Sequence, residues 1–336
     1  MKLQVGVIGL GDHWETRYRP ALTALADRFE VRAIYAPVAR LAENAARQWG
    51  GETVDGFRTL TSREDIDAVL VLGRQWCGVL PVLAACEAGK AVYCAADFDL
   101  DLPQAAAVCD RVDRSGVAFM AELPRRYAPA TVRLKELIAT HLGPAQLLFC
   151  HQRVPAAPRR DTAATGRAAS VATRNLVELI DWCCYVVGRA PTAAIGVQHP
   201  GDGNSAALDY EMLSLQFAPG APSDSEALAQ ISCGRYMPDS WPEAIAFRPP
   251  AQLQVSCERG VAFADLPTSL VWFDDAGRHV ESLDDERPLG EQMLMQFHRA
   301  VTSLVLKTSG LADTYRALKI LSSARDGFRE GRRMTL

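Results

Sequence analysis

The amino-terminal segment constrains the fold most strongly, because a short apolar run ends abruptly at a pair of glycines. The run is Leu3-Gln-Val-Gly-Val-Ile-Gly9, and Leu10-Gly11 and a helical stretch at 20–28 follow it. An apolar run of this length, stopped by glycine before a helix, is typical of a buried strand, a tight turn and a helix. The chain therefore begins with the first unit of an alternating strand–helix fold.

The same alternation continues through the first third of the chain. Further strands are predicted at 31–36, 68–72, 91–94 and 117–120, and helices at 39–48, 79–88 and 103–115. Strands separated by helices of this length are joined in parallel by right-handed crossovers. We therefore expect an α/β protein in which residues 1–122 form a doubly wound parallel sheet that binds a dinucleotide.

After residue 122 the pattern changes. The sequence predicts a helix at 129–140, a strand at 147–150, a loop rich in Pro, Arg and Ala, and a long helix at 171–187. Short strands then predominate, and the chain closes with two helices; the strands include 212–217, 227–233, 253–257 and 270–273, and the helices span 289–306 and 313–329. We expect residues 123–336 to form a second, α+β domain with a large, mostly antiparallel sheet. A length of 336 residues favours two domains.

Composition excludes several classes of function. The formal net charge is −4 and the Lys and Arg residues are scattered, so nucleic acid is not an expected partner. No apolar run approaches the roughly 20 residues that span a bilayer, so we expect a cytoplasmic protein without a membrane partner. Nine cysteines without C-x-x-C spacing indicate reduced, mostly buried thiols. The histidines show no metal-ligand spacing, so no metal site is expected.

The turn after the first strand suits a nucleotide. Two glycines let the backbone approach a pyrophosphate, and the start of a helix offers free N–H groups to it. Trp14 stands where a G-x-G-x-x-G motif has its third glycine, and Arg17 and Arg19 either add positive charge or are simply solvated. The residues predicted to bind the cofactor are Gly9, Leu10, Gly11, Asp12, His13, Trp14, Ala36, Arg40, Leu72, Gly73 and Arg74.

The second strand leaves the choice between NAD and NADP open. It ends Ile34-Tyr35-Ala36-Pro37, without the carboxylate that would accept hydrogen bonds from the ribose hydroxyls of NAD. Arg40 lies a few residues further on. Its side chain could meet the 2′-phosphate of NADP, or it could be an exposed helix residue.

Several segments together resemble the Gfo/Idh/MocA family of dehydrogenases. They are Ile66-Asp-Ala-Val-Leu-Val, Ala84-Ala-Cys-Glu-Ala-Gly-Lys90, Gly116-Val-Ala-Phe-Met, Arg125-Arg-Tyr127 and Glu330-Gly-Arg-Arg, so the resemblance spans nearly the whole chain. It implies a Rossmann first domain, NAD(P)-dependent oxidation of sugars or polyols, and a homodimer or homotetramer formed through the exposed face of the second domain's sheet.

The positions that carry chemistry in this family differ here. The family's Glu-Lys-Pro triplet corresponds to Ala95-Ala96-Asp97, so the catalytic lysine is replaced by Ala96. Counted back from Asp181 and Gly188, the Asp and His of the family's substrate helix correspond to Arg174 and Glu178. The resemblance therefore implies an altered active site.

Other side chains could take over the chemistry. Glu178 could act as general acid or base while Arg174 orients a carboxylate or phosphate, or the two could form only an i, i+4 ion pair. Tyr93 could donate a proton, or it could serve packing. The residues predicted to bind substrate in a cleft between the domains are Glu122, Arg125, Arg126, Tyr127, His151 and Arg153. Basic residues outnumber acidic ones in this set, which indicates an anionic or sugar-like ligand.

Two functions follow from these observations. The first is an NAD(P)-dependent oxidoreductase of the sugar or polyol dehydrogenase type with a rearranged proton-transfer group. The second is a catalytically inactive nucleotide or sugar sensor, or a partner subunit, on the same fold. Non-redox chemistry such as elimination or hydrolysis is a third, weaker alternative.

Overall fold

The chain folds into two compact units. The computed structural model describes residues 1–73, 77–95, 102–156, 162–200, 208–220, 225–238, 240–247, 250–303 and 310–336. Contacts group Met1–Pro124 with Arg287–Tyr315 in the first unit, and Arg125–Glu286 with Arg316–Leu336 in the second. A segment close to the carboxyl terminus therefore returns to the first unit.

The first unit contains a six-stranded sheet of order β3-β2-β1-β4-β5-β6, in which all neighbouring strands are parallel. The strands are β1 (Leu3–Ile8), β2 (Phe29–Tyr35), β3 (Glu52–Thr53), β4 (Ala68–Val71), β5 (Ala91–Cys94) and β6 (Phe119–Ala121). The order reverses between β1 and β4, where doubly wound folds bind their ligands. The predicted doubly wound parallel sheet is confirmed.

Helices connect these strands. They are η1 (Trp14–Tyr18), α1 (Arg19–Ala24), α2 (Ala39–Trp49), α3 (Phe57–Thr61), α4 (Leu80–Glu87) and α5 (Leu102–Ser115). Every residue of β4 and β5 is buried, as expected for parallel strands covered on both faces. Helix α10 (Leu289–Thr302) joins the unit from far along the sequence and contacts η1, α1 and β6.

The second unit contains a nine-stranded sheet of order β14-β13-β12-β11-β7-β10-β9-β8-β15. The strands are β7 (Ala145–Ala156), β8 (Ala193–Pro200), β9 (Leu208–Phe217), β10 (Ala227–Pro238), β11 (Leu253–Cys257), β12 (Gly260–Asp265), β13 (Ser269–Asp274), β14 (Gly277–Ser282) and β15 (Met334–Thr335). Only β7 and β10 pair in parallel, and the other neighbours are antiparallel. The predicted, mostly antiparallel sheet is confirmed.

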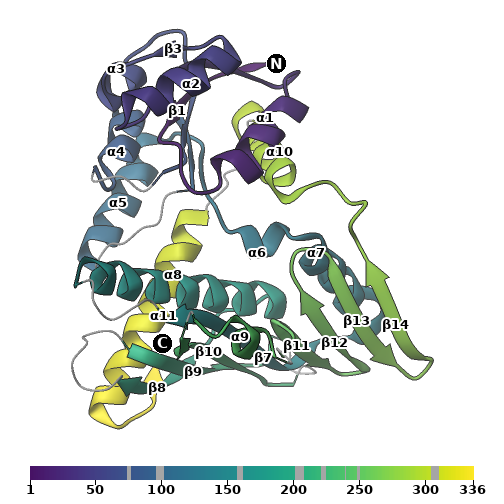
Figure 1. Ribbon diagram of the computed structural model, residues 1–336. Helices are drawn as coiled ribbons and strands as arrows, with labels where there is room; N and C mark the ends of the chain where they lie inside the picture. Colours follow the sequence, from purple (N-terminus) through teal and green to yellow (C-terminus); the bar gives the residue numbers. More distant parts are fainter. Residues whose placement is uncertain are drawn as a thin grey trace. The chain divides into compact units, whose positions relative to one another are not determined.

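Two long helices, α8 (Thr162–Val187) and α11 (Gly310–Glu330), lie along one face of this sheet (Figure 1). Their apolar residues share a buried core with the strands, to which Trp182, Leu321 and Phe217 belong. The shorter helices are α6 (Pro124–Tyr127), α7 (Pro129–Leu137), η2 (Ile138–Leu142) and α9 (Pro242–Ala246). The core thus fixes the position of α8, which carries Arg174 and Glu178.

Two segments differ from the sequence-based expectation. The helix after the glycine turn begins at Trp14 as a π-helical turn, in which the N–H groups of Arg17 and Tyr18 lie 2.9 and 3.2 Å from the carbonyl oxygen of His13. Strand β7 continues to Ala156, through a stretch that was expected to be a loop. Pairing with β10 extends to Ala156, and local composition does not reveal such a partner from a distant part of the sequence.

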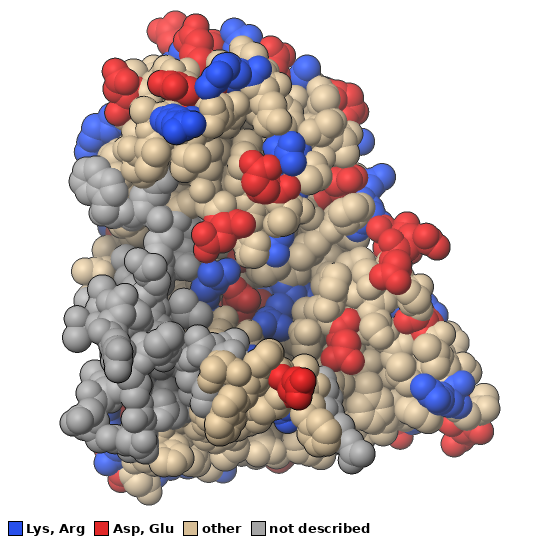
Figure 2. Space-filling model, in the orientation of Figure 1, with Lys and Arg blue, Asp and Glu red and all other residues tan. Residues whose placement is uncertain are grey.

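Acidic and basic side chains are interspersed over the face of the molecule shown in Figure 2. Among the ion pairs, Arg32 and Arg63 both contact Asp65, at 3.3 and 2.8 Å. Within the described residues, no helix combines the length and apolar character needed to cross a bilayer.

Candidate functional site

The glycine turn links the ends of three strands in the first unit. Gly9 has φ +78°, a left-handed conformation that favours glycine, and its N–H donates to the carbonyl of Tyr35 at 2.7 Å. A Cβ on Gly11 would lie 2.1 Å from the carbonyl oxygen of Leu72, which follows β4. The two glycines therefore let the turn fit closely between the ends of β2 and β4.

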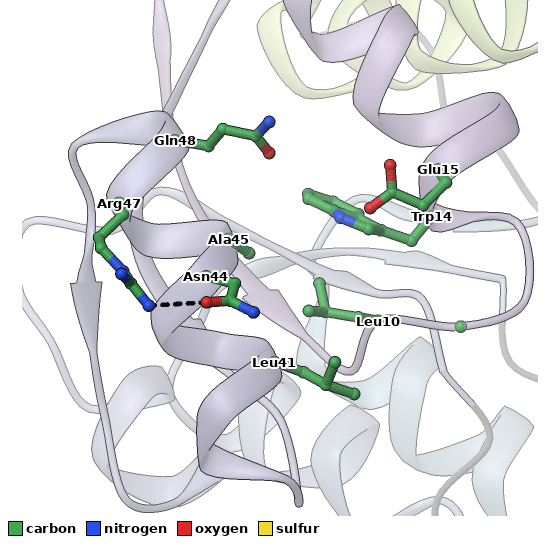
Figure 3. Close-up of a pocket in the computed structure, with 9 residues that line it drawn as sticks. Leu10, Trp14, Glu15, Leu41, Asn44, Ala45, Arg47 and Gln48 are labelled. Carbon is green, nitrogen blue, oxygen red and sulfur yellow. Dashed lines mark hydrogen bonds between the residues drawn. The ribbon is translucent and has the colours of Figure 1, made fainter.

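A groove of about 620 Å³ lies beside this turn, between η1 and α2 (Figure 3). Its volume is in the range of small-molecule sites, about 300–1,000 Å³. Its lining combines apolar side chains, one indole, two amides and two charged groups: Leu10, Gly11, Trp14, Glu15, Leu41, Asn44, Ala45, Arg47 and Gln48.

The walls of the groove carry defined interactions. The Arg47 guanidinium donates to the side-chain oxygen of Asn44 at 2.7 Å, and Nε of Arg19 lies 2.8 Å from the carboxylate of Glu15. Trp14 is almost fully buried, with 5% of its surface exposed. This donor and acceptor set, with an aromatic wall beside a glycine turn, fits a nucleotide cofactor.

The predicted cofactor residues that the structure describes lie at different places around the glycine turn. Leu10, Gly11 and Trp14 line the groove. Asp12 and His13 are exposed just before η1, whereas Ala36, Leu72 and Gly73 are buried at the ends of β2 and β4. Arg40 is exposed on α2 and is not among the lining residues. Arg74 and Ala96 lie outside the described residues.

Glu122 and Tyr93 belong to a cluster within the first unit. Arg17 and Tyr18 each donate a hydrogen bond to one carboxylate oxygen of Glu122. Tyr93 is fully buried, its ring edge-on to Tyr18 and to Phe297 at centroid distances of 6.2 and 5.6 Å. Burial, followed by the charge of Glu122, raises the pKa of both tyrosines well above its ordinary value. Both hydroxyls therefore stay protonated, and the cluster holds η1 against β6.

In the second unit, charged side chains gather around α8. Glu178 accepts a hydrogen bond from Nε of Arg174 at 3.0 Å, and Nε of Arg125 lies 3.5 Å from its other carboxylate oxygen. Nε of Arg126 donates to Asp181 at 2.7 Å, and a second guanidinium nitrogen bonds the other oxygen of that carboxylate. The structure thus brings Arg125 and Arg174 together at Glu178, and it places Arg126 at Asp181 on the same helix.

Arg125 is held from several sides. Its terminal nitrogens donate to the side-chain oxygens of Gln152 at 3.1 Å and of Gln252 at 3.4 Å. Its guanidinium lies over the Trp182 ring, 5.4 Å from the centroid. A guanidinium fixed in this way is oriented before any ligand arrives.

His151 and Arg153 are placed differently. Side chains alternate along β7, so both residues lie on the sheet face opposite Gln152. Nδ1 of His151 lies 2.7 Å from the hydroxyl of Ser232, and Arg153 donates to the carbonyl of Phe247 at 3.2 Å. Burial, with the charge of Arg153 second, lowers the pKa of His151. Tyr127 is half-buried on α6. The structure therefore does not bring His151 and Arg153 together with Glu178.

Sequence reasoning missed Glu15, Asn44 and Gln48. A signal for the α2 pair was present, because Leu41, Asn44 and Gln48 recur at helical spacing and share one face. Nothing in the sequence indicated that this face would lie opposite Glu15. Among the described residues, no three His, Cys, Asp or Glu side chains are grouped as a metal site would need.

Comparison with known proteins agrees with this architecture. Residues 3–123 match the Gfo/Idh/MocA model, described as an oxidoreductase family with an NAD-binding Rossmann fold. Inositol 2-dehydrogenase 3 of Saccharopolyspora erythraea is 29% identical over 188 residues, which are 54% of each chain. The chain thus spans about half the length of this curated relative.

Two solved structures share the fold over the whole chain. Aldose-aldose oxidoreductase from Caulobacter crescentus, complexed with glycerol, has a TM-score of 0.83 at 17% identity and covers 100% of both chains. Levoglucosan dehydrogenase, in complex with NADH and levoglucosan, has a TM-score of 0.80 at 17% identity and covers 100% of this chain and 99% of its own. At these identities the likeness concerns the fold alone. The first unit is thus similar, over residues 3–123, to the NAD-binding Rossmann domain of the Gfo/Idh/MocA oxidoreductases.

Proposed function

We propose that the protein is an NAD(P)-dependent oxidoreductase of the sugar or polyol dehydrogenase type with an altered active site. Residues 1–122 would bind the dinucleotide, and residues 123–336 would bind substrate and form the oligomer. The observation that carries the proposal is the position of Glu178 on α8, hydrogen-bonded to Arg174 and close to Arg125. By the resemblance, this carboxylate stands at the position where the family has its proton-transfer histidine.

Relatives support the substrate class. One is an inositol 2-dehydrogenase, and one related fold binds NADH together with levoglucosan. Inositol and levoglucosan are both polyhydroxylated rings. A bound nicotinamide supplies the hydride acceptor in such chemistry.

The residues of this chain would then divide the remaining work. In the place of the family's histidine, Glu178 would take the proton from the substrate hydroxyl as hydride leaves the carbon that bears this hydroxyl. Arg174 and Arg125 would orient the ligand. Tyr93 is fully buried, so we assign it a positioning role through Tyr18 and η1.

An anionic sugar derivative fits this set of side chains best. Arg125 donates to two neutral amide oxygens, and within the described parts of the chain its ion pair is with the carboxylate of Glu178, which Arg174 also contacts. Guanidinium groups bind carboxylates and phosphates in a bidentate manner. A sugar acid or a sugar phosphate would therefore be preferred over a neutral polyol.

The competing proposal is a catalytically inactive sensor or partner subunit. The observation that favours it is the ion pair between Arg174 and Glu178, because an i, i+4 pair on a helix also has a purely structural role. Such a protein would bind a nucleotide without turning it over.

The test begins with titration of the protein with NADH and NADPH, followed by transfer of tryptophan fluorescence to the nicotinamide. A panel of polyols, sugar acids and sugar phosphates is then screened for turnover. Glu178→Gln should lower kcat by about 10²–10⁴-fold without changing NADH affinity. Glu136→Gln, on the exposed side of α7, is the matched control.

The outcomes separate the two functions. Binding with turnover that Glu178→Gln abolishes supports the dehydrogenase. Binding without turnover across the panel favours the sensor or partner subunit. Binding of neither dinucleotide contradicts the nucleotide site itself.

We also propose a homodimer or homotetramer formed through the sheet face opposite α8. Apolar side chains of neighbouring strands are exposed there, including Phe149, Leu228 and Ile195 at 37, 43 and 46%. Exposed apolar patches of this kind commonly mark protein interfaces. The double variant Phe149→Asp, Leu228→Asp should be a monomer when its molar mass is measured by light scattering. Phe328→Asp on α11 should leave the molar mass of the oligomer unchanged. A wild-type monomer would contradict the proposal.

A further inference from the structure

Lys135 on α7 reaches the carboxyl-terminal end of α8. Its Nζ donates a hydrogen bond to the carbonyl oxygen of Val186 at 3.2 Å and lies 5.5 Å from the centroid of the Tyr185 ring. Gly188 follows the helix in an exposed position, and a Cβ on it would lie 3.7 Å from this Nζ. The half-buried amine therefore lies between backbone and an aromatic ring, and the glycine has no side chain to cover it.

The surroundings of this amine disfavour its charged form. Within the described residues no carboxylate pairs with Lys135, and the adjacent Glu136 lies 3.2 Å from the guanidinium of Arg133 instead. The Tyr185 ring attracts a cation, but the Arg126 guanidinium already lies over the same ring, 5.1 Å from the centroid. Burial therefore lowers the pKa of Lys135. A lysine that is desolvated near another cation becomes nucleophilic closer to neutral pH.

The other described lysines differ from Lys135. Lys90 is also half-buried, and its Nζ also donates to a backbone carbonyl, that of Ile66 at 2.7 Å, but among the described residues no aromatic ring lies beside this amine. Lys2 lies 3.6 Å from a carboxylate, and Lys319 is exposed on α11. Of these four lysines, Lys135 has the surroundings that most favour a neutral amine, and Lys90 is its matched comparison.

We propose that Lys135 is a site of acylation by activated acyl donors, namely acyl phosphates or acyl thioesters. The lone pair of the neutral amine attacks the carbonyl carbon of the donor and forms a C–N bond. The bond from that carbon to the phosphate oxygen or the thiolate sulfur breaks, and the amine nitrogen releases one proton to solvent. The product is an uncharged amide. This reactivity is independent of the proposed nucleotide site and of hydride transfer.

Acylation of Lys135 removes a cation from the end of α8. The carbonyl groups in the last turn of a helix carry partial negative charge, which an ammonium group at Val186 stabilises. Glu178 and Asp181 lie in the preceding turns of the same helix, and Asp181 accepts a hydrogen bond from Arg126 at 2.7 Å. The modification therefore acts on the helix that carries the candidate proton-transfer group.

The test compares the acylation rates of individual lysines in the folded, full chain. The protein is incubated with acetyl phosphate and, separately, with acetyl-CoA over a range of pH, and acetylation at each lysine is quantified by mass spectrometry of chymotryptic peptides. At mildly alkaline pH, Lys135 should react about threefold faster than Lys90, or more. Each unit by which a pKa is lowered raises the neutral fraction about tenfold and lowers the nucleophilicity by a smaller factor. The rate at Lys135 should also level off at a lower pH than the rate at Lys90.

Two controls separate reactivity from sequence context and from folding. In urea-unfolded protein the two lysines should react at similar rates, because only the folded structure buries Lys135 among its neighbours. Lys135→Gln imitates the uncharged amide, whereas Lys135→Arg keeps the cation. The thermal midpoint of Lys135→Gln should lie about 1–4 °C below that of Lys135→Arg.

Each outcome bears on the proposal. Faster acetylation of Lys135 by either donor, with the lower pH midpoint, supports it and identifies the acyl source. Acetylation no faster than that of Lys90, or with the same pH profile, overturns it. A rate difference that persists in urea overturns it as well, because the fold is then not the cause. Equal thermal midpoints for Lys135→Gln and Lys135→Arg would overturn the proposed effect on α8.

Discussion

Glu211 on β9 and Arg325 on α11 form a bidentate ion pair inside the second unit. Nε and Nη2 of Arg325 each lie 2.8 Å from one carboxylate oxygen. Gln198 donates to the same carboxylate at 3.0 Å, and Arg325 also donates to Thr173 on α8 at 3.2 Å. The carboxylate side chain is 7% exposed. One ion pair therefore joins two strands and both long helices.

Removing the arginine should strongly destabilise the protein. Arg325→Met leaves Glu211 buried without its counter-charge, so the free energy of unfolding should fall by about 3–5 kcal/mol. Urea denaturation followed by circular dichroism measures the change. Arg329→Met removes the neighbouring, largely exposed pair with Asp326 and should have little effect. Equal losses in the two variants would contradict a structural role for the buried pair.

His151 should make stability depend on pH. Burial lowers its pKa below the ordinary value of 6.5, so the folded state binds fewer protons than the unfolded state at mildly acidic pH. The contribution of His151 to the free energy of unfolding is complete at pH values above the ordinary pKa of histidine, and it is lost as the pH falls from there toward the folded-state pKa. Between about one pH unit above and one below that ordinary pKa, the free energy of unfolding of His151→Gln should therefore decline less than that of the wild type.

Urea titrations at the two pH values give this comparison. A glutamine can still hydrogen-bond to Ser232, which keeps the packing of the site comparable. His199→Gln, at an exposed position on β8, serves as the control. A pH dependence that is the same in the wild type and in His151→Gln would refute the assignment.

The glycine turn should not tolerate a methyl group at Gly11. The added Cβ would lie 2.1 Å from the carbonyl oxygen of Leu72, a backbone atom that cannot simply rotate away. Gly11→Ala should cost about 1–3 kcal/mol of unfolding free energy and weaken NADH binding, because the turn must move. Gly56→Ala, whose Cβ would meet nothing closer than 3.9 Å, should retain NADH affinity. Wild-type stability and affinity in Gly11→Ala would show that the turn adjusts freely.

A buried hydrogen bond anchors α8 to α7. Nε1 of Trp182 donates to the hydroxyl of Thr131 at 2.9 Å, and both side chains are fully buried. Thr131→Val leaves the indole N–H unpaired and should cost about 1–3 kcal/mol of unfolding free energy. Adding Trp182→Phe removes that unpaired donor. The double variant should therefore lose less unfolding free energy than the two single variants lose together. Strict additivity in urea denaturation would contradict the coupling.

Much of the first unit could be predicted from the sequence. The apolar runs at β1, β4 and β5 are short, continuous and stopped by turn residues, so local pattern alone defines them. The two-residue β3 and the five-residue α3 were missed, because elements this short carry no periodic signal. The extent of β7 was also missed, because the backbone of residues 151–156 is paired with β10, a strand far away in the sequence.

The candidate site, like the fold, could be predicted from the sequence only in part. By itself the sequence determined the glycine turn and the helical spacing that places Arg174 and Glu178 on one face of α8, because both depend on residues near one another in the chain. Only the tertiary structure decided that Glu15 would face α2 across a groove, that Arg125 would reach Glu178, and that α10 would join the first unit. Each of these contacts joins segments far apart in the sequence, and the packing of helices and the pairing of strands bring such segments together.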